Sequence, residues 1–554
     1  MKRLTMTAAL AALIVMVRCA PGACGAVADP ASAENSADYA AVCPDALCGA
    51  LAPLLALRES QGLKPAVVRL ADVYRAFPAA SHAESVRDFV HHAYRNWRAP
   101  RLKYLLLVGD SAAVGGGDES LLVPNHYLEA EPRSYVRKES EKLASDHHYS
   151  LMDDDELPDV AVGRIPADDA DELKAVVAKI VDYESSGAVG EWRKKASFFA
   201  SEGHFGALDK SLEKMAKNMV RHNVLPIFDL SMTYANPNLP YFYPADEFND
   251  KVVERFNERP LFMIYIGHGR PEGFDDVWFD GKRHPIMQKE DVPRVKAGDG
   301  RYPIVFIIAC STGHFDSPEF DSIGEMLIKS PGGPVGVLAS SRVSDPYGNS
   351  VLSREIARAL LQGLEPRIGD AVVKAKRGMV ENLDADRRYI DKFASLFIRK
   401  SEMETAIREH LYLYNYLGDP ATLVQFPRGR VEAEAPATAA PGERLEIAGR
   451  VVGMTTGRAA VTFECEPVTT AHPVEPLEGL DDTAYRAAVR RNYANANDKV
   501  VARAEVPVAD GKLKAALDVP QSIPGGVYHV KVFAWNEETE AAGYAEVRLG
   551  GGAP

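Results

Sequence analysis

The chain lacks an excess of positive charge and, beyond its N-terminus, any long apolar run. Its 554 residues carry a formal net charge of −14, so it has no basic stripe of the kind that binds nucleic acid, and a nucleic-acid partner is excluded. No later stretch reaches the roughly 18 apolar residues of a transmembrane helix. Phosphate-binding glycine loops, heptads and repeats of fixed period are also missing. These absences leave a globular protein that acts on something other than nucleic acid.

The N-terminus has the pattern of a secretory signal. Lys2 and Arg3 precede a short apolar core, Ala8 to Val17, and the sequence AVA at residues 26–28 offers a cleavage site. We therefore predict a signal peptide over residues 1–28. Export would place the mature protein in the periplasm, at the cell surface or outside the cell.

Cysteine is scarce, with six in the whole chain. Two of them leave with the predicted signal peptide. Cys43 and Cys48 are close enough in sequence for a local disulfide, which an oxidising compartment permits. Cys310 and Cys465 have no obvious partner, and a single cysteine in an exported protein is a candidate reactive thiol.

Alternating strand and helix patterns fill most of the chain and predict a mostly parallel α/β sheet covered on both faces. The alternation of strands and helices occurs on both sides of about residue 190, so we expect two adjoining subdomains, 29–190 and 191–430. Residues 431–443 are rich in Ala, Pro and Glu and are predicted to be a linker. Residues 444–550 switch to period two, which predicts an immunoglobulin-like β-sandwich.

Two apolar runs end on reactive side chains. LFMIYIGHG reaches His268 and Gly269, and YPIVFIIAC reaches Cys310. Continuous apolar runs are typical of strands buried on both faces, and ligands of open α/β sheets bind at the carboxyl ends of strands. The two side chains are therefore expected to share one crevice.

A thiol and an imidazole in one crevice are the parts of a nucleophilic site. The imidazole raises the thiolate fraction of the cysteine and later protonates the leaving amine. The N–H groups of Gly269 and Cys310 are positioned to form an oxyanion hole. Taken singly, His268 is more simply a core histidine and Cys310 a structural thiol. Their occurrence together at strand ends favours catalysis.

These motifs resemble those of the gingipain family, cysteine peptidases of the caspase-like clan. IYIGHG and FIIACSTGHF occur here in the family's order, and further similar segments extend the resemblance over about residues 39–426. They are SDHHYSLMDDDELPDVAVGRIP, FFASEG, VGVLASS and LGDPATLV. The resemblance implies a caspase-like fold, an immunoglobulin-like domain behind it, and protein or peptide substrates.

By motif, the resemblance implies that Cys310 is the nucleophile and His268 the general base and acid. Glu202, in the sequence ASEG, matches the carboxylate that accompanies the histidine. Asp209 falls near the acid that selects basic P1 residues in arginine-specific members, although the match needs a gap and an ordinary helix-start residue explains it equally well. His314 follows the nucleophile too closely to be its base, and we expect it to contact substrate or solvent.

The resemblance also implies structural Ca²⁺. The acidic run from Asp153 to Asp159 is the candidate ligand loop, with a solvated turn as the alternative. No cofactor is expected for the chemistry itself. The globular pattern begins about ten residues after the predicted cleavage site, which leaves no room for the long propeptide of that family.

Three functions remain open at this point. The first is an exported endopeptidase, possessing the site just described. The second is a sortase-like transpeptidase, in which an amine intercepts the same thioacyl intermediate. The third is a non-catalytic binding module on a peptidase-like scaffold. The sequence does not fix the oligomeric state.

Overall fold

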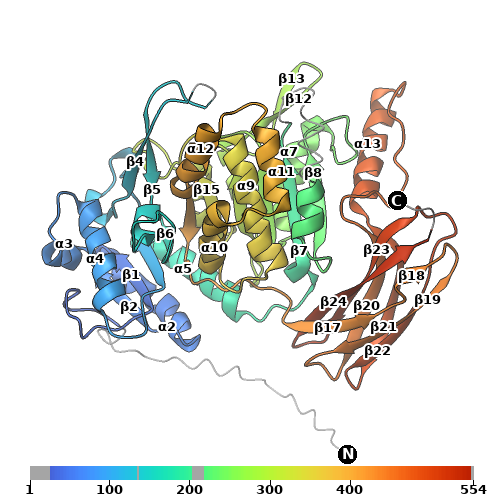
Figure 1. Ribbon diagram of the computed structural model, residues 1–554, viewed down its shortest axis with the longest axis horizontal. Helices are drawn as coiled ribbons and strands as arrows, with labels where there is room; N and C mark the ends of the chain where they lie inside the picture. Colours follow the sequence, from blue (N-terminus) through green and yellow to red (C-terminus); the bar gives the residue numbers. More distant parts are fainter. Residues whose placement is uncertain (1–24, 134–135, 203–216, 551–554) are drawn as a thin grey trace, which may run out of the picture.

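The computed structural model of the protein describes residues 25–133, 136–202 and 217–550. An α/β domain carries the N-terminal and central parts of the chain, and an all-β domain follows it at one end of the molecule (Figure 1). Each domain has its own hydrophobic core. Within the described residues, no helix is both long and apolar enough to cross a membrane.

Ten strands form one sheet through the α/β domain. In order across the sheet they are β2 (Pro65–Arg69), β1 (Tyr39–Cys43), β3 (Tyr104–Val108), β6 (Ala161–Ile165), β16 (Tyr414–Gly418), β15 (Gly336–Ser340), β14 (Ile304–Ile308), β9 (Phe262–Ile266), β7 (Lys195–Ala200) and β8 (Asp229–Tyr234). β16 pairs antiparallel with β15 and parallel with β6, and the other neighbouring pairs are parallel. The sheet therefore has two parallel halves that run in opposite directions, which confirms the predicted fold class.

Helices cover both faces of this sheet. In Figure 1, α9 (Pro346–Ala357), α10 (Ile368–Glu381), α11 (Ala385–Ala394) and α12 (Lys400–Leu413) lie in front of it. α8 (Ile323–Lys329) packs against β15, β16 and α5 (Ala170–Ser185). This domain also contains α1 (Asp45–Cys48), α2 (Ala52–Ser60), α3 (Leu70–Ala76), α4 (His82–Asn96) and α7 (Phe248–Asn257), and residues 217–223 are helical as well. Every residue of β14, β15 and β16 is buried, as double coverage requires.

Three short hairpins project from this domain. They are β4 (His126–Ala130) with β5 (Glu141–Ser145), β10 (Gly269–Arg270) with β11 (Gly273–Phe274), and β12 (Asp276–Phe279) with β13 (Lys282–Pro285). The second hairpin starts directly after His268. It therefore turns the chain away from the sheet at the end of β9.

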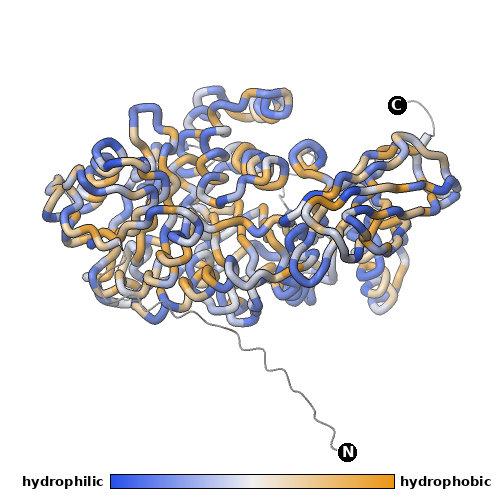
Figure 2. Tube along the Cα trace, turned by 90° about the horizontal axis from the view of Figure 1, so that it is seen from below, coloured by the Kyte–Doolittle hydropathy of each residue, from blue (hydrophilic) through white to orange (hydrophobic). Residues whose placement is uncertain are grey.

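The C-terminal domain is built mainly of β-strands, as predicted, with one inserted helix. Its strands are β17 (Gly429–Glu434), β18 (Thr438–Ala439), β19 (Arg444–Val451), β20 (Thr456–Cys465), β21 (Val500–Ala509), β22 (Lys512–Asp518), β23 (Gly526–Trp535) and β24 (Glu540–Leu549), and α13 (Asp482–Asn497) is inserted between β20 and β21. Buried and exposed residues alternate along β19 and β22, and apolar and polar segments alternate along the trace (Figure 2). β17 pairs with both β19 and β24, so the pairings close into a barrel-like ring.

The prediction that residues 431–443 form a linker is wrong. β17 and β18 lie in or across this segment and pair with β24, and β17 also pairs with β19. Only Val431 and Ala439 of these two strands are buried. Strands that contribute so few side chains to the core need no apolar periodicity, because backbone hydrogen bonds hold them.

The C-terminal domain is joined to the sheet by the ion pairs Lys531–Asp229 and Arg193–Glu540, of which only the second is buried on both sides. Lys531 Nζ lies 2.6 Å from Asp229 Oδ1 and 3.0 Å from Glu464 Oε2. Arg193 Nε lies 3.2 Å from Glu540 Oε1, and both side chains are almost fully buried. These contacts fix the domain against β8 and the segment before β7.

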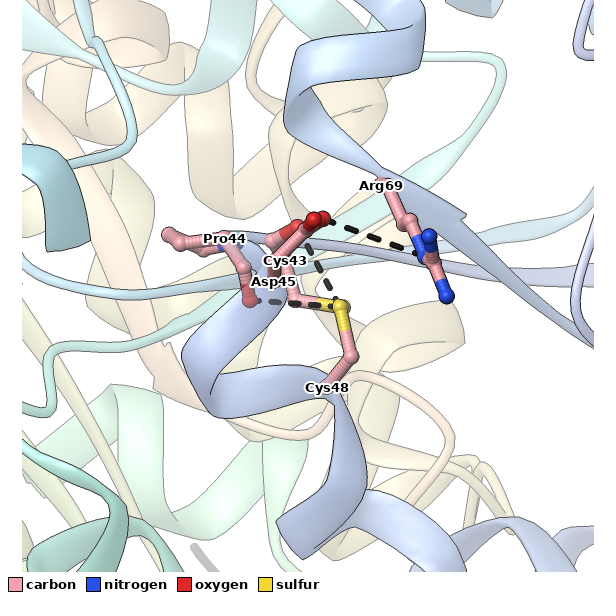
Figure 3. The surroundings of a disulfide bond; sticks show 5 residues. All are labelled: Cys43, Pro44, Asp45, Cys48 and Arg69. Carbon is pink, nitrogen blue, oxygen red and sulfur yellow. Dashed lines mark hydrogen bonds and ion pairs between the residues drawn. A yellow bond between two sulfur atoms is a disulfide. The ribbon is translucent and has the colours of Figure 1, made fainter. Parts of the chain in front are cut away.

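Cys43 and Cys48 form a disulfide between the end of β1 and α1 (Figure 3). The Sγ atom of Cys48 also contacts the carbonyl oxygen of Cys43 at 3.3 Å. Most of the predicted signal peptide, residues 1–24, lies outside the described residues. At the predicted cleavage site, Val27 N–H donates to Val67 O at 2.9 Å, beside β2.

Candidate active site

Three neighbouring strands end level with one another. Ile266 of β9 is in register with Ala200 of β7 and with Ile308 of β14. Two residues beyond these positions come His268, Glu202 and Cys310. Because paired strands lie only about 4.8 Å apart, the structure brings the three predicted catalytic residues to one edge of the sheet.

The main chain of His268 is held by two side chains while its ring is exposed. Its N–H donates to Ser201 Oγ at 3.1 Å, and its carbonyl oxygen accepts from the Tyr265 hydroxyl at 2.7 Å. Ser201 in turn is the residue before Glu202. The main chain of His268 is therefore fixed, and its imidazole faces solvent.

The positions on either side of His268 require glycine, because neither has room for a Cβ atom. A Cβ on Gly267 would lie 2.0 Å from Ser201 Oγ, and one on Gly269 would lie 2.8 Å from the carbonyl oxygen of Cys310. Either substitution forces the strand ends apart. The absence of side chains here lets the two predicted oxyanion residues, Gly269 and Cys310, approach each other.

Cys310 is a half-buried free thiol. The next residue, Ser311, has a positive φ of 56°, and its N–H donates to the carbonyl oxygen of Arg342 at 2.9 Å. This turn stops β14 and aims the cysteine at the loop after β15. In that loop Ser344 N–H donates to Cys310 Sγ at 3.4 Å.

Glu202 is half-buried. Asp209, the predicted selector of basic substrates, lies outside the described residues. His314 is directed to another partner: its Nε2 lies 3.5 Å from Asp316 Oδ1, and Asp316 binds Arg342 at 2.7 and 2.6 Å. Burial and the Arg342 charge lower the pKa of His314. The His314 imidazole therefore pairs with a carboxylate of its own loop.

The carboxylate oxygens of the acidic run, Asp153 to Asp159, do not converge on one position. Asp153 and Asp155 each accept a backbone N–H two residues further on, and Asp159 accepts the N–H of Met152. In the described part of the chain, the clusters of three metal-ligating groups occur elsewhere. The arrangement is that of a solvated turn, and Ca²⁺ at this loop stays a prediction from resemblance.

Two such clusters occur in the described residues, and the groups around each disfavour a metal ion. Asp110, Asp321 and Glu325 surround Lys329, whose Nζ lies 2.9 Å from Asp321. The second cluster is Glu84, His126 and His148, in which the two imidazoles stack with centroids 3.7 Å apart. Stacked rings direct their in-plane lone pairs side by side, and do not converge as zinc ligands must.

The stacked histidine pair should make stability depend on pH. Burial, with the neighbouring His126 and Arg87, lowers the pKa of His148 to about 3, although Glu84 Oε1 lies 3.2 Å from its Nε2. Between pH 6.5 and 3 the unfolded chain therefore binds a proton that the folded chain does not, so the free energy of unfolding falls as pH falls.

We expect this fall to be smaller in His148→Gln by about 2 kcal/mol between pH 6.5 and 4, a figure reduced for the partial exposure of the ring. Urea unfolding at several pH values measures it. Parallel curves for the variant and the wild type would contradict the prediction.

Sequence reasoning missed a polar network behind the cysteine. It comprises Ser344 and Asn349, from the loop after β15 and from α9, with Tyr414 and His410 from β16 and α12. Ser344, Tyr414 and His410 are buried. No local motif marks these residues, because the antiparallel pairing of β15 with β16 brings them together.

Comparisons with known proteins give a family and a fold. The family model described as "Peptidase family C25" matches residues 32–425. A solved structure described as "Structure of Protease" has 14% identity and a TM-score of 0.52, and the match covers 93% of this chain and 97% of that chain. At that identity the likeness shows a shared fold.

Weaker structural matches carry no argument. The sulfur carrier protein SoxY from Chlorobium limicola f thiosulfatophilum matches with 12% identity and a TM-score of 0.13, over 22% of this chain and 78% of that chain. The alpha-2-macroglobulin of E. coli matches with 14% identity and a TM-score of 0.16, over 25% of this chain and 11% of that chain. No curated protein matches significantly.

Proposed function

Because the chain belongs to peptidase family C25, the gingipain family of cysteine endopeptidases, we propose that it hydrolyses peptide bonds through a thioacyl-enzyme on Cys310. The observation that carries this proposal is that β14, β9 and β7 end in common register, two residues before Cys310, His268 and Glu202. A nucleophile, a base and a carboxylate at one edge are the groups that acyl transfer requires.

In the proposed reaction, Cys310 Sγ attacks the scissile carbonyl carbon as its proton passes to His268. The N–H groups of Gly269 and Cys310 stabilise the negative oxygen of the tetrahedral intermediate. His268 then gives the proton to the leaving amine, and the thioester forms. Water, deprotonated by His268, attacks the thioester and releases the carboxylic acid and the free thiol.

We also propose that the protein is exported through residues 1–28 and acts on proteins or peptides with basic P1 residues. The support is the predicted signal peptide and the resemblance at Asp209. A fluorogenic peptide library that varies P1, assayed with a thiol reductant, tests substrate choice. Cleavage after Arg or Lys that iodoacetamide blocks is the expected result.

The same assay distinguishes the alternatives. A ligated product that outpaces hydrolysis when an amine is added would identify a transpeptidase. If no peptide in the library is cleaved or ligated, with or without Ca²⁺, the endopeptidase proposal fails.

Glu202→Gln is expected to lower kcat/KM about 10- to 100-fold, because the neutral amide no longer stabilises the imidazolium that forms during attack. KM should change little, since Glu202 is not proposed to contact substrate. Steady-state kinetics on the best library peptide measures the effect. Glu290→Gln, at an exposed carboxylate, is the control, and equal activity of the two variants would count against the role of Glu202.

A further inference from the structure

The sulfur of Cys310 has a close neighbour in the loop between β15 and α9. Ser344 places three groups around it: the backbone N–H at 3.4 Å, the side-chain Oγ at 3.6 Å and the carbonyl oxygen at 3.7 Å. A protonated thiol can donate to the carbonyl oxygen. A thiolate can instead accept from the N–H and from the hydroxyl, so Ser344 has groups for both states of the sulfur.

Ser344 is held in place by the contacts of the next residue, Asp345. Asp345 is the N-cap of α9, and its Oδ1 accepts the N–H of Tyr347 at 2.8 Å. Its Oδ2 pairs with Arg133 at 3.2 Å, where both side chains are buried. Its own N–H donates to His410 Nε2 at 3.3 Å. The loop therefore cannot carry Ser344 away from the sulfur without breaking buried polar contacts.

The direction of the Ser344 hydroxyl depends on Asn349. Tyr414 is fully buried, so its hydroxyl proton needs an acceptor, and Asn349 Oδ1 lies 2.6 Å away. In this orientation of the amide, Asn349 Nδ2 faces Ser344 Oγ at 2.8 Å and donates to it. A hydroxyl that already accepts this bond can donate its own proton either to the Tyr414 hydroxyl oxygen or to Cys310 Sγ at 3.6 Å, and an ionised sulfur is the stronger acceptor of the two.

We propose that the Ser344 hydroxyl donates a hydrogen bond to the ionised sulfur of Cys310, and that Asn349 is the positioning residue that orients this hydroxyl. The inference rests on the proposed role of Cys310 as nucleophile. It assigns to the loop after β15 a part in activating the thiol, alongside the histidine at the end of β9. The thiolate gains a charge-assisted hydrogen bond, which is stronger than one between neutral groups.

Thiol alkylation tests this without requiring a substrate. The rate of reaction of Cys310 with iodoacetamide is measured from pH 5 to 9 on the full chain, and the labelled residue is identified by mass spectrometry. Cys465 is the other free cysteine of the described residues, and burial raises its pKa to about 11, so it should react slowly. Unaltered circular dichroism shows that each variant folds.

Ser344→Ala is expected to slow alkylation about three- to tenfold at pH 7 and to move the midpoint of the pH profile upward, as loss of one hydrogen bond to a charged group predicts. Asn349→Ala should slow it about threefold. The double variant should be no slower than Ser344→Ala, because Asn349 acts through Ser344. Ser350→Ala, whose hydroxyl bonds to Pro346 O in the same helix, is the matched control and should react like the wild type.

Two results would overturn the inference. One is a wild-type rate and pH profile for Ser344→Ala. The other is faster alkylation of Asn349→Ala, since exchange of the two amide ends would place Nδ2 toward His410 Nε2, 3.2 Å from the present Oδ1, and make Ser344 donate to Asn349. Failure of the peptidase proposal gives a different result. In that case the wild type cleaves no peptide, while the alkylation rates of the variants still differ as described.

Discussion

Cys310→Ala is expected to abolish peptide hydrolysis, with kcat falling by about 10⁴- to 10⁶-fold, as happens when the nucleophile of an acyl-transfer site is removed. Without Sγ no thioester forms, and any remaining rate comes from binding and the oxyanion N–H groups. The half-buried thiol makes only weak hydrogen bonds with Ser344. The free energy of unfolding should therefore change by no more than about 1 kcal/mol.

Progress curves on the best library peptide, with active-site titration of the wild type, measure this loss. Cys465→Ala is the matched control, because it removes the free cysteine that the structure describes in the β domain and should keep full activity. Substantial hydrolysis by Cys310→Ala would show that another group carries the reaction. A large loss of stability in that variant would make the activity loss uninformative, and thermal unfolding is measured beside it.

Arg58→Met is expected to destabilise the α/β domain by about 3–5 kcal/mol. Arg58, on α2, is fully buried between Glu184 of α5 and Asp419, which follows β16, at 2.7 and 2.8 Å. Neither carboxylate is exposed. Methionine fills a similar space but leaves two buried negative charges without a cation, and that desolvation cost is the source of the effect.

Urea unfolding followed by circular dichroism measures the change. Arg58→Lys keeps the charge but loses the forked geometry that bonds both carboxylates, so an intermediate loss is expected. Arg101→Met, at an exposed arginine that stacks on Tyr94, should change stability by no more than about 0.5 kcal/mol. If Arg58→Met were as stable as the wild type, the ion pairs of Arg58 with Glu184 and Asp419 would not be what holds α2 to the centre of the sheet.

Much of the α/β fold was predictable because its strands are continuous apolar runs. IVFII and FMIYI are buried on both faces in the structure, and such runs have few alternatives in a globular chain. The same reasoning failed at β17 and β18, where Ala, Pro and Glu predominate. Those strands are defined by pairing with β24, a partner about a hundred residues away, and no local pattern reports such pairing.

The sequence by itself determined which residues end the strands, and so proposed Cys310, His268 and Glu202 as members of one site. A strand end is a local property, since it depends on where an apolar run stops. Only the tertiary structure decided that β7, β9 and β14 are adjacent and in common register, which sets the three level. It alone decided that β16 runs antiparallel to β15 and so packs Tyr414, His410 and Asn349 behind Ser344. Contacts across such distances in sequence arise when the chain buries its core, and their partners are fixed by packing and not by neighbouring residues.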